Sequence, residues 1–383
     1  MAKAVYVGVG SKARKMKKAY IGIGGKARKV KKMYIGDSSG KARLCYSAEL
    51  EKVGTVDYLS NERKSLAAAS VGNYALFAGG DISHTSSGRI ANTVEAYNTS
   101  LTKSMPTVMS TERHNHAGAS VEGYALFAGG ANMDRSTAAV DSVDAYNASL
   151  TRTAAAALSG TRVWMGAASL EGRAFFAGGA STNTNSRNWC ANVEVYNGTL
   201  TRTAATNLSV ARYWPLTAII GNRVLFAGGM ASGATKVVDV YSASLTRTAA
   251  ADLSNYSGGG GGPGDDAAAA VGNYAIFAFY NSTSSDIYNA SLTKTTATIL
   301  SVARPEMSTG TVGDYALFAG GDRNSPYSDI VDACDASLTR ITATALSDSR
   351  RGPSSATVGD YLLFAGGYKS YDEPSHVVDV YTA

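Results

Sequence analysis

The tetrapeptide Phe-Ala-Gly-Gly recurs along most of the chain and constrains its fold more than any other feature. Six copies and one degenerate copy, Phe-Ala-Phe-Tyr, follow one another at intervals of 41 to 51 residues. They begin at Phe77, Phe127, Phe176, Phe226, Phe277, Phe318 and Phe364. Self-similarity at such a period indicates a repeat architecture and takes precedence over the assignment of single strands.

Each repeat contains four short apolar or small-residue stretches separated by turn residues. In the second repeat, for example, the first stretch is residues 118–121 and the second is the alternating stretch that ends in the di-glycine. A variable polar loop, the third stretch at residues 143–146 and a tight Asn-Ala-Ser turn follow. A Leu-Ser-x-x-Arg segment then leads into the next repeat, and no helical 3.6-residue periodicity is present. Four strands per ~48 residues are typical of propeller blades, so we predict an all-β, seven-bladed β-propeller.

The two ends of the chain predict how the ring closes. The last repeat reaches Tyr381 without the Ser-Leu-Thr-Arg stretch that follows in the other repeats. A matching stretch lies ahead of the first repeat, where residues 46–52 align with residues 241–247. We therefore expect residues 46–52 to complete the last blade and to pair its otherwise exposed edge.

The repeat resembles the kelch repeat. A di-glycine closes an apolar strand, and the next strand ends in Tyr97, Tyr146, Tyr196, Tyr241, Tyr288 and Tyr381. Kelch repeats usually carry Trp in the fourth strand, where this chain has an aliphatic residue that we expect to fill the same space: Leu101, Leu150, Leu200, Leu245, Leu292 and Leu338. The resemblance implies a ligand-binding face formed by the connections between strands.

Charge divides the chain into two parts. Residues 1–43 carry 13 Lys and Arg against one acidic residue, a net charge of +12, whereas the remainder carries 23 basic and 29 acidic residues, a net charge of −6. This asymmetry indicates a boundary, so we predict a basic segment over 1–45 and a propeller over 46–383. No apolar run approaches the ~20 residues that cross a bilayer, and membrane insertion is not expected.

The basic segment is itself repetitive. Its apolar stretches, 4–10, 19–24 and 33–36, alternate with three copies of Lys-Ala-Arg and predict a small β-meander. The segment resembles the basic repeats of tail-associated structural proteins of phages and prophages of Gram-positive bacteria. This resemblance implies an anchor to other virion proteins, in a multi-copy assembly, through Tyr6, Lys12, Arg14, Tyr20, Lys26, Arg28, Tyr34, Lys41 and Arg43. Two alternatives are phosphate binding in nucleic acid and a solubilising or oligomerising arm.

No group of residues predicts catalysis. His114-Asn115-His116 spells the name of a nuclease class, but a propeller strand cannot supply the ββα-metal arrangement of that class. The three cysteines show neither zinc spacing nor a disulfide framework. We therefore predict a protein that is not an enzyme and that needs no metal or cofactor.

Arginine recurs just before the first strand in six of the seven repeats, at Arg63, Arg113, Arg162, Arg212, Arg304 and Arg350. Because strand directions alternate, this connection and the variable loop after the di-glycine emerge on the same face. The aromatic residues expected on that face are Trp164, Trp189, Tyr213, Trp214, Tyr327, Tyr368 and Tyr371. Arginine with aromatic residues suits anionic or sugar-containing ligands such as cell-wall glycopolymers. The alternative is that each arginine caps backbone carbonyls between blades.

Together these features predict a non-enzymatic virion structural protein of a phage or phage-like particle, assembled in the bacterial host cytoplasm. The basic segment would attach it to the particle, and the propeller would bind a host cell-wall glycopolymer or surface protein or decorate the particle. The alternative is a kelch-type cytosolic scaffold for protein–protein interaction. Nucleic-acid binding through the basic arm comes third.

Overall fold

The computed structural model describes residues 6–9, 12–15, 19–23, 26–30, 32–36, 42–47, 49–82, 89–132, 138–182, 188–255, 266–322, 327–369 and 373–383. All secondary-structure elements within these ranges are β-strands, which confirms the predicted all-β class. In the same ranges, no helix is long and apolar enough to cross a membrane.

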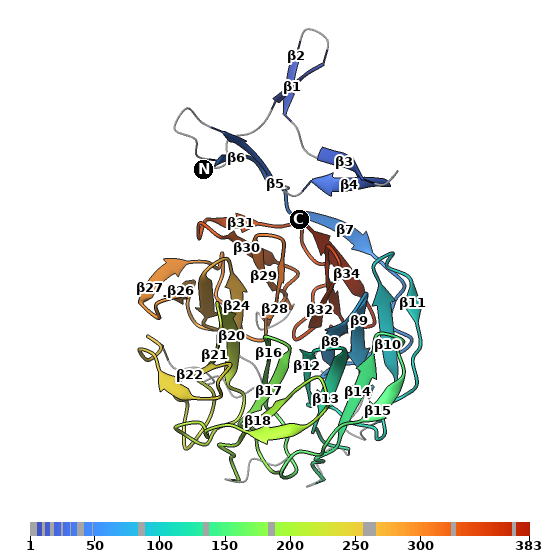
Figure 1. Cartoon of the computed structure of the whole chain (residues 1–383), viewed down its shortest axis with the longest axis vertical. Helices are drawn as coiled ribbons and strands as arrows, with labels where there is room; N and C mark the ends of the chain where they lie inside the picture. Colours follow the sequence, from blue (N-terminus) through green and yellow to red (C-terminus); the bar gives the residue numbers. More distant parts are fainter. Residues whose placement is uncertain are drawn as a thin grey trace.

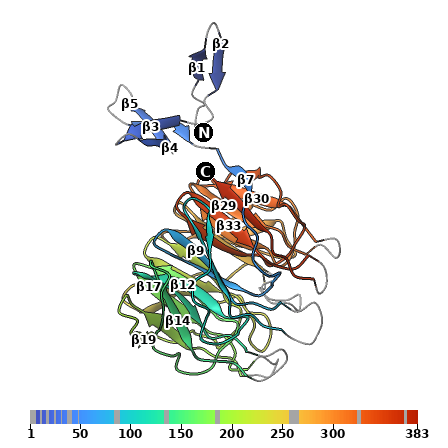
Figure 2. The ribbon, with the colours of Figure 1, turned by 90° about the vertical axis from the view of Figure 1, so that its right-hand side faces the viewer.

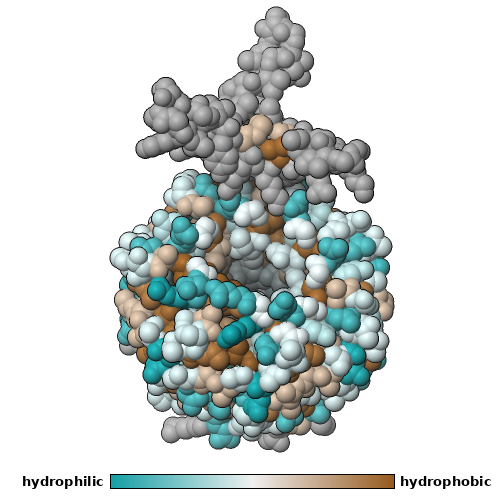
Figure 3. Space-filling model, in the orientation of Figure 1, coloured by the Kyte–Doolittle hydropathy of each residue, from teal (hydrophilic) through white to brown (hydrophobic). Residues whose placement is uncertain are grey.

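The described strands form seven four-stranded antiparallel sheets around a central hollow, so the predicted seven-bladed β-propeller is confirmed (Figure 1). Figure 3 shows the hollow in the space-filling view. Blade 1 consists of β8 (Ala67–Val71), β9 (Tyr74–Ala78), β10 (Val94–Asn98) and β11 (Lys103–Ser104). Blade 2 consists of β12 (Ala117–Val121), β13 (Tyr124–Ala128), β14 (Val143–Asn147) and β15 (Arg152–Ala154). Blade 3 consists of β16 (Gly166–Leu170), β17 (Arg173–Ala177), β18 (Val193–Tyr196) and β19 (Arg202–Ala204).

The remaining blades repeat this order of strands. Blade 4 consists of β20 (Leu216–Ile220), β21 (Arg223–Ala227), β22 (Val238–Ser242) and β23 (Arg247–Ala249). Blade 5 consists of β24 (Ala267–Val271), β25 (Tyr274–Ala278), β26 (Ser284–Asn289) and β27 (Lys294–Thr298). Blade 6 consists of β28 (Ser308–Val312), β29 (Tyr315–Ala319), β30 (Val331–Asp335) and β31 (Arg340–Thr342). Blade 7 consists of β32 (Ser354–Val358), β33 (Tyr361–Ala365), β34 (Val378–Thr382) and, from the start of the chain, β7 (Glu51–Thr55).

Strand β7 closes the ring by pairing with β34, as the sequence predicts. Lys52 lies opposite Tyr381, in the same register as Arg247 opposite Tyr241 in blade 4. The predicted strand over 46–52 starts too early, because Tyr46 and Ser47 belong to β6 (Ala42–Ser47) and pair with β5 (Lys32–Gly36). The register shifts between Val380 and Tyr381, and Gly54, which pairs with Val380 beside this shift, has φ of +132°, a conformation that residues with a Cβ rarely adopt.

The first strand of each blade lines the hollow. Successive first strands contact one another from β8 through β32, and β32 contacts β8. Their small residues, such as Ala67–Val71, permit this close approach. The hydrophobic core lies between the blades. Leu76 and Val94 of blade 1 pack in one cluster with Phe127 and Tyr146 of blade 2, and Leu150 packs against that cluster as expected.

The recurring tyrosine fastens each blade to the connection that precedes it. Its ring meets the phenylalanine of its own blade edge-on, as for Phe127 and Tyr146 with centroids 5.9 Å apart. Its hydroxyl donates to a backbone carbonyl, for example from Tyr146 to Thr107 at 2.9 Å and from Tyr241 to Thr206 at 2.9 Å. Cys334 takes this position in blade 6, is fully buried, and has a thiol whose pKa burial raises to about 12.

The di-glycine is required by the contact between neighbouring blades. Gly178 and Gly179 have φ of +65° and +98°, and a Cβ on Gly178 would clash with the carbonyl oxygen of Arg212, which lies in the connection to blade 4. Blade 5 has Phe279 and Tyr280 instead, without positive φ, and the Tyr280 amide donates to Asp266 Oδ1 at 2.6 Å.

The basic segment forms three separate hairpins in place of the single meander predicted. They are β1 (Tyr6–Val9) with β2 (Lys12–Lys15), β3 (Ala19–Ile23) with β4 (Lys26–Val30), and β5 with β6. Each apolar stretch pairs with the Lys-Ala-Arg run that follows it, as Gly22 does with Ala27. Figure 2 shows the hairpins outside the ring, on the side where β7 enters blade 7.

Candidate functional site at the mouth of the channel

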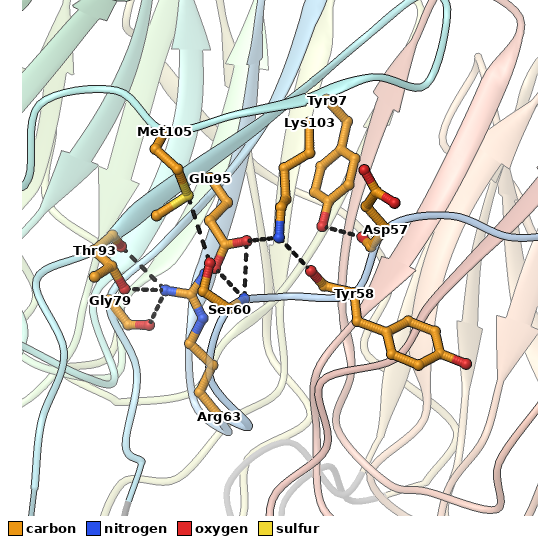
Figure 4. Close-up of polar contacts among 10 residues, drawn as sticks. All are labelled: Asp57, Tyr58, Ser60, Arg63, Gly79, Thr93, Glu95, Tyr97, Lys103 and Met105. Atoms are coloured by element: carbon orange, nitrogen blue, oxygen red, sulfur yellow. Dashed lines mark hydrogen bonds and ion pairs between the residues drawn. The ribbon is translucent and has the colours of Figure 1, made fainter.

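The recurring arginine lies inside the blade. The Arg63 guanidinium contacts Glu95 of β10 at 2.6 Å and donates to the carbonyls of Gly79 and Thr93 at 3.2 and 3.1 Å (Figure 4). The backbone amide of Ser60 donates to the same carboxylate at 2.9 Å. Arg63 and Glu95 are both fully buried, so this pair fixes the connection to the third strand.

The same ion pair recurs in five further blades. Its members are Arg113 with Asp144, Arg162 with Glu194, Arg212 with Asp239, Arg304 with Asp332 and Arg350 with Asp379. The six arginines are at most 2% exposed. Burial lowers the pKa of Arg212, against the opposing effect of Asp239. These guanidinium groups are thus engaged inside the blades, where they bond to carbonyls of their own blade and not to carbonyls between blades as the capping alternative had it. That these arginines also contact a ligand stays a prediction.

The residue two positions after each arginine forms a ring at the end of the inner strands. These residues are Ser65, Asn115, Trp164, Trp214, Glu306 and Gly352, and all have φ between +52° and +59°. Their backbones are linked from blade to blade, from the Trp164 amide to Asn115 at 3.2 Å and from the Trp214 amide to Trp164 at 2.9 Å. We use the name channel mouth for three sets of residues: these six residues, the residues next to them in the sequence, and the loops that isolated β-bridges join to those neighbours.

Four predicted aromatic residues meet at the channel mouth on blades 3 and 4. Ring centroids lie 5.0 Å apart for Trp164 and Trp214, 4.6 Å for Tyr213 and Trp214, and 6.4 Å for Trp189 and Tyr213. Trp189 is held there because its loop bridges through Ala180 to Val163. We call Trp164, Trp189, Tyr213 and Trp214 the aromatic quartet.

The aromatic quartet combines apolar faces with polar edges. All four residues are partly exposed, and Trp164 and Tyr213 pack on a small apolar cluster that includes Ala131 and Ala180. The indole Nε1 atoms of Trp164 and Trp214 are buried and have no hydrogen-bond acceptor within the described ranges. Trp and Tyr combine an apolar ring with one polar group, and for this reason they are enriched at binding interfaces.

The opposite part of the channel mouth is charged. The Arg351 guanidinium lies 5.0 Å from the Tyr327 ring and 4.7 Å from the Tyr368 ring. It also contacts Glu306 at 2.5 Å and Asp322 at 3.5 Å. Tyr327 and Tyr368 are thus brought together as predicted, but around Arg351, which the sequence reading missed. Its signal was its place directly after a recurring arginine, as for Tyr213.

The remaining predicted residues are less fully described. Tyr371 and Lys41 lie outside the described residues. The other anchoring residues lie on strands β1 to β6, with side chains that are likewise outside the description. Across the described part of the chain, no group of three or more His, Cys, Asp or Glu residues could hold a metal ion.

The fold and the channel mouth define the chain as a seven-bladed β-propeller. No protein-family model matches the sequence, and a search of curated proteins finds no match. The chain is similar to the solved structure described as "Structure of YjhT", with a TM-score of 0.53 and 13% identity over 85% of this chain and 96% of that chain. At this identity the likeness shows the fold alone, and the kelch and phage-tail resemblances stay predictions.

Proposed function

We propose that this protein is a non-enzymatic structural component of a phage or phage-like particle that binds a host cell-wall glycopolymer at the channel mouth. A β-propeller fold suggests an interaction role, and the aromatic quartet is the observation that carries the choice of ligand. The C–H faces of a sugar ring pack on indole and phenol rings, and all four rings of the aromatic quartet are partly exposed.

The choice of an anionic polymer rests on Arg351. Its guanidinium lies over the Tyr368 ring at 4.7 Å and is partly exposed beside Glu306, whereas Lys64, 4.9 Å from the same ring, is buried beside Asp81. Charges placed at a rim act mainly on the rate and specificity of association. We assign binding energy to the aromatic quartet and selection of ligand charge to Arg351.

The basic segment supports attachment to other virion proteins. Residues 1–43 have a net charge of +12, whereas the remainder of the chain has a net charge of −6. Immunogold labelling of purified particles tests this part of the proposal: label on the particle is expected. Salt-sensitive DNA binding by the full chain, with no label on particles, would favour the nucleic-acid alternative instead.

Ligand binding is tested with Trp214→Gly in the full chain. Glycine suits the φ of +52° at this position, and blade 7 already carries Gly352 at the equivalent place. Binding to Gram-positive cell walls, measured by co-sedimentation, should weaken by about ten- to a hundredfold, as expected for a central aromatic contact. Walls from which the anionic glycopolymer has been extracted should bind neither the unmodified protein nor Trp214→Gly.

The matched control is Tyr58→Ala, which removes an aromatic residue that is 45% exposed and does not belong to the aromatic quartet. Its binding to walls should equal that of the unmodified protein. Equal losses in both variants would contradict a site at the aromatic quartet. Binding that is unchanged in Trp214→Gly would favour the scaffold alternative.

A further inference from the structure

Blade 5 differs from the other six in how its buried carboxylate is balanced. In those six blades, a carboxylate on the third strand forms ion pairs with the buried arginine and with a second cationic side chain on the fourth strand. In blade 4, Asp239 lies 2.9 Å from both Arg212 and Arg247. The second cations in the other five are Lys52, Lys103, Arg152, Arg202 and Arg340. Each of these carboxylates therefore has two positive groups beside it.

Asp286 is the equivalent carboxylate of blade 5, and it is fully buried. Its Oδ2 accepts from the Ser254 amide at 2.6 Å and lies 3.7 Å from Lys294 of β27. Its Oδ1 is buried and has no hydrogen-bond partner among the residues that the structure describes. The sequence accounts for this difference: Ser257 stands where the other repeats have arginine, and residues 256–265 include no Lys or Arg.

Backbone oxygens complete the comparison. In blade 6, Arg304 donates to the carbonyls of Phe318 and Ile330 at 3.0 and 3.3 Å. The register places Phe277 and Ser284 at the same positions in blade 5, with Phe277 opposite Asp286 as Phe318 is opposite Asp332. Blade 5 thus offers one carboxylate oxygen and backbone carbonyls where the fold elsewhere holds a singly charged cation.

We propose that blade 5 binds a monovalent metal cation of the size of K⁺ at Asp286 Oδ1. Carbonyl oxygens can replace the hydration shell of such an ion, and a carboxylate adds the charge. One positive charge restores the balance that arginine gives the other six blades, whereas a divalent ion would bury one charge more at a cost in desolvation. This inference is independent of the proposed function.

The test compares the melting temperature of the full chain in 100 mM KCl and in 100 mM tetramethylammonium chloride. An ion that binds only the folded state stabilises it by mass action, so we expect a melting temperature about 1 to 3 °C higher in KCl. Asp286→Asn keeps the shape of the side chain but removes its charge, and should abolish this difference. Asp239→Asn in blade 4 is the matched control: it should lower the melting temperature but leave the difference between the two salts.

Two outcomes would overturn the proposal: equal melting temperatures in both salts, or a potassium effect that survives in Asp286→Asn. If Asp286→Asn does not fold, crystals of the unmodified full chain soaked in RbCl decide the question. An anomalous peak within coordination distance of Asp286 Oδ1 is expected. Its absence would refute the site.

Discussion

The six buried ion pairs and the channel mouth lie a few residues apart in six of the seven repeats, yet they differ in burial, bonding and repetition. Arg212 is fully buried, bonded within its own blade and repeated around the ring. Tyr213 and Trp214, the next two residues, are partly exposed. Tyr213 differs from its counterpart after each of the other five arginines, and Trp214 is matched only by Trp164 of blade 3. Repetition here accompanies stability, and variation accompanies the surface that a ligand would meet.

The largest expected effect comes from removing the strand that closes the ring. Deleting residues 1–55 removes β7 and with it Lys52, which lies 2.8 Å from Asp379 and so completes the ion pair of blade 7. We expect aggregation or loss of the cooperative melting transition, because β34 would become an exposed edge. Deleting residues 1–48 retains β7 and should leave the melting curve of the ring intact. Similar curves for the two truncations would contradict this account of closure.

Breaking one ion pair should cost less. Arg212→Ala leaves Asp239 buried without its main partner, and we expect the free energy of unfolding to fall by about 3 to 5 kcal/mol in chemical denaturation. The double variant Arg212→Met with Asp239→Leu removes both charges and should recover most of this loss. Wall binding by folded Arg212→Ala should remain, since its guanidinium is buried. Weaker binding at unchanged stability would return this arginine to the ligand site.

The smallest effect concerns His116, which follows Asn115 at the channel mouth and is buried where blade 1 has Leu66. Burial, aided by Arg113 and His114, holds its pKa well below the usual value, so the folded protein keeps it neutral. The unfolded chain takes up a proton near pH 6.5, and the free energy of unfolding should therefore fall as pH drops below that value. His116→Leu should flatten the dependence between pH 5 and 6.5 and change little at pH 8. An unchanged slope would contradict a neutral buried His116.

The carboxylates of the ion pairs titrate in a separate, more acidic window. Burial alone raises the pKa of Glu194, but Arg162, Ser159 and Arg202 lower it below its usual value. Asp379 behaves alike, with burial opposed by Arg350, Lys52 and Ser347. Because these folded-state pKa values are depressed, their stabilisation is present above about pH 4 and is lost as pH falls further. Measurements above pH 5 thus separate the effect of His116 from that of these carboxylates.

The sequence by itself determined the blade count, the all-β class and the closing register of Lys52 opposite Tyr381. Each follows from a period, and a period fixes what recurs because every blade must present the same strands to its neighbours. It also placed Tyr213 and Trp214 on the face of the variable loops, since strand directions alternate. Its boundary for the closing strand failed because Tyr46 can pair equally well in a hairpin with β5.

Only the tertiary structure decided the ion-pair partners of the arginines and which aromatic residues meet. The partner of Arg212 is Asp239, 27 residues further on, and no spacing rule shows that the guanidinium points into the blade instead of toward solvent. Trp164 and Trp214 are 50 residues apart and meet because closing the ring brings equivalent positions of neighbouring blades together. The missing second positive group beside Asp286 can be recognised only by comparing its contacts within the described ranges with those of the equivalent carboxylates in the other six blades. A repeat fixes which residues are equivalent, but packing decides what each equivalent residue touches.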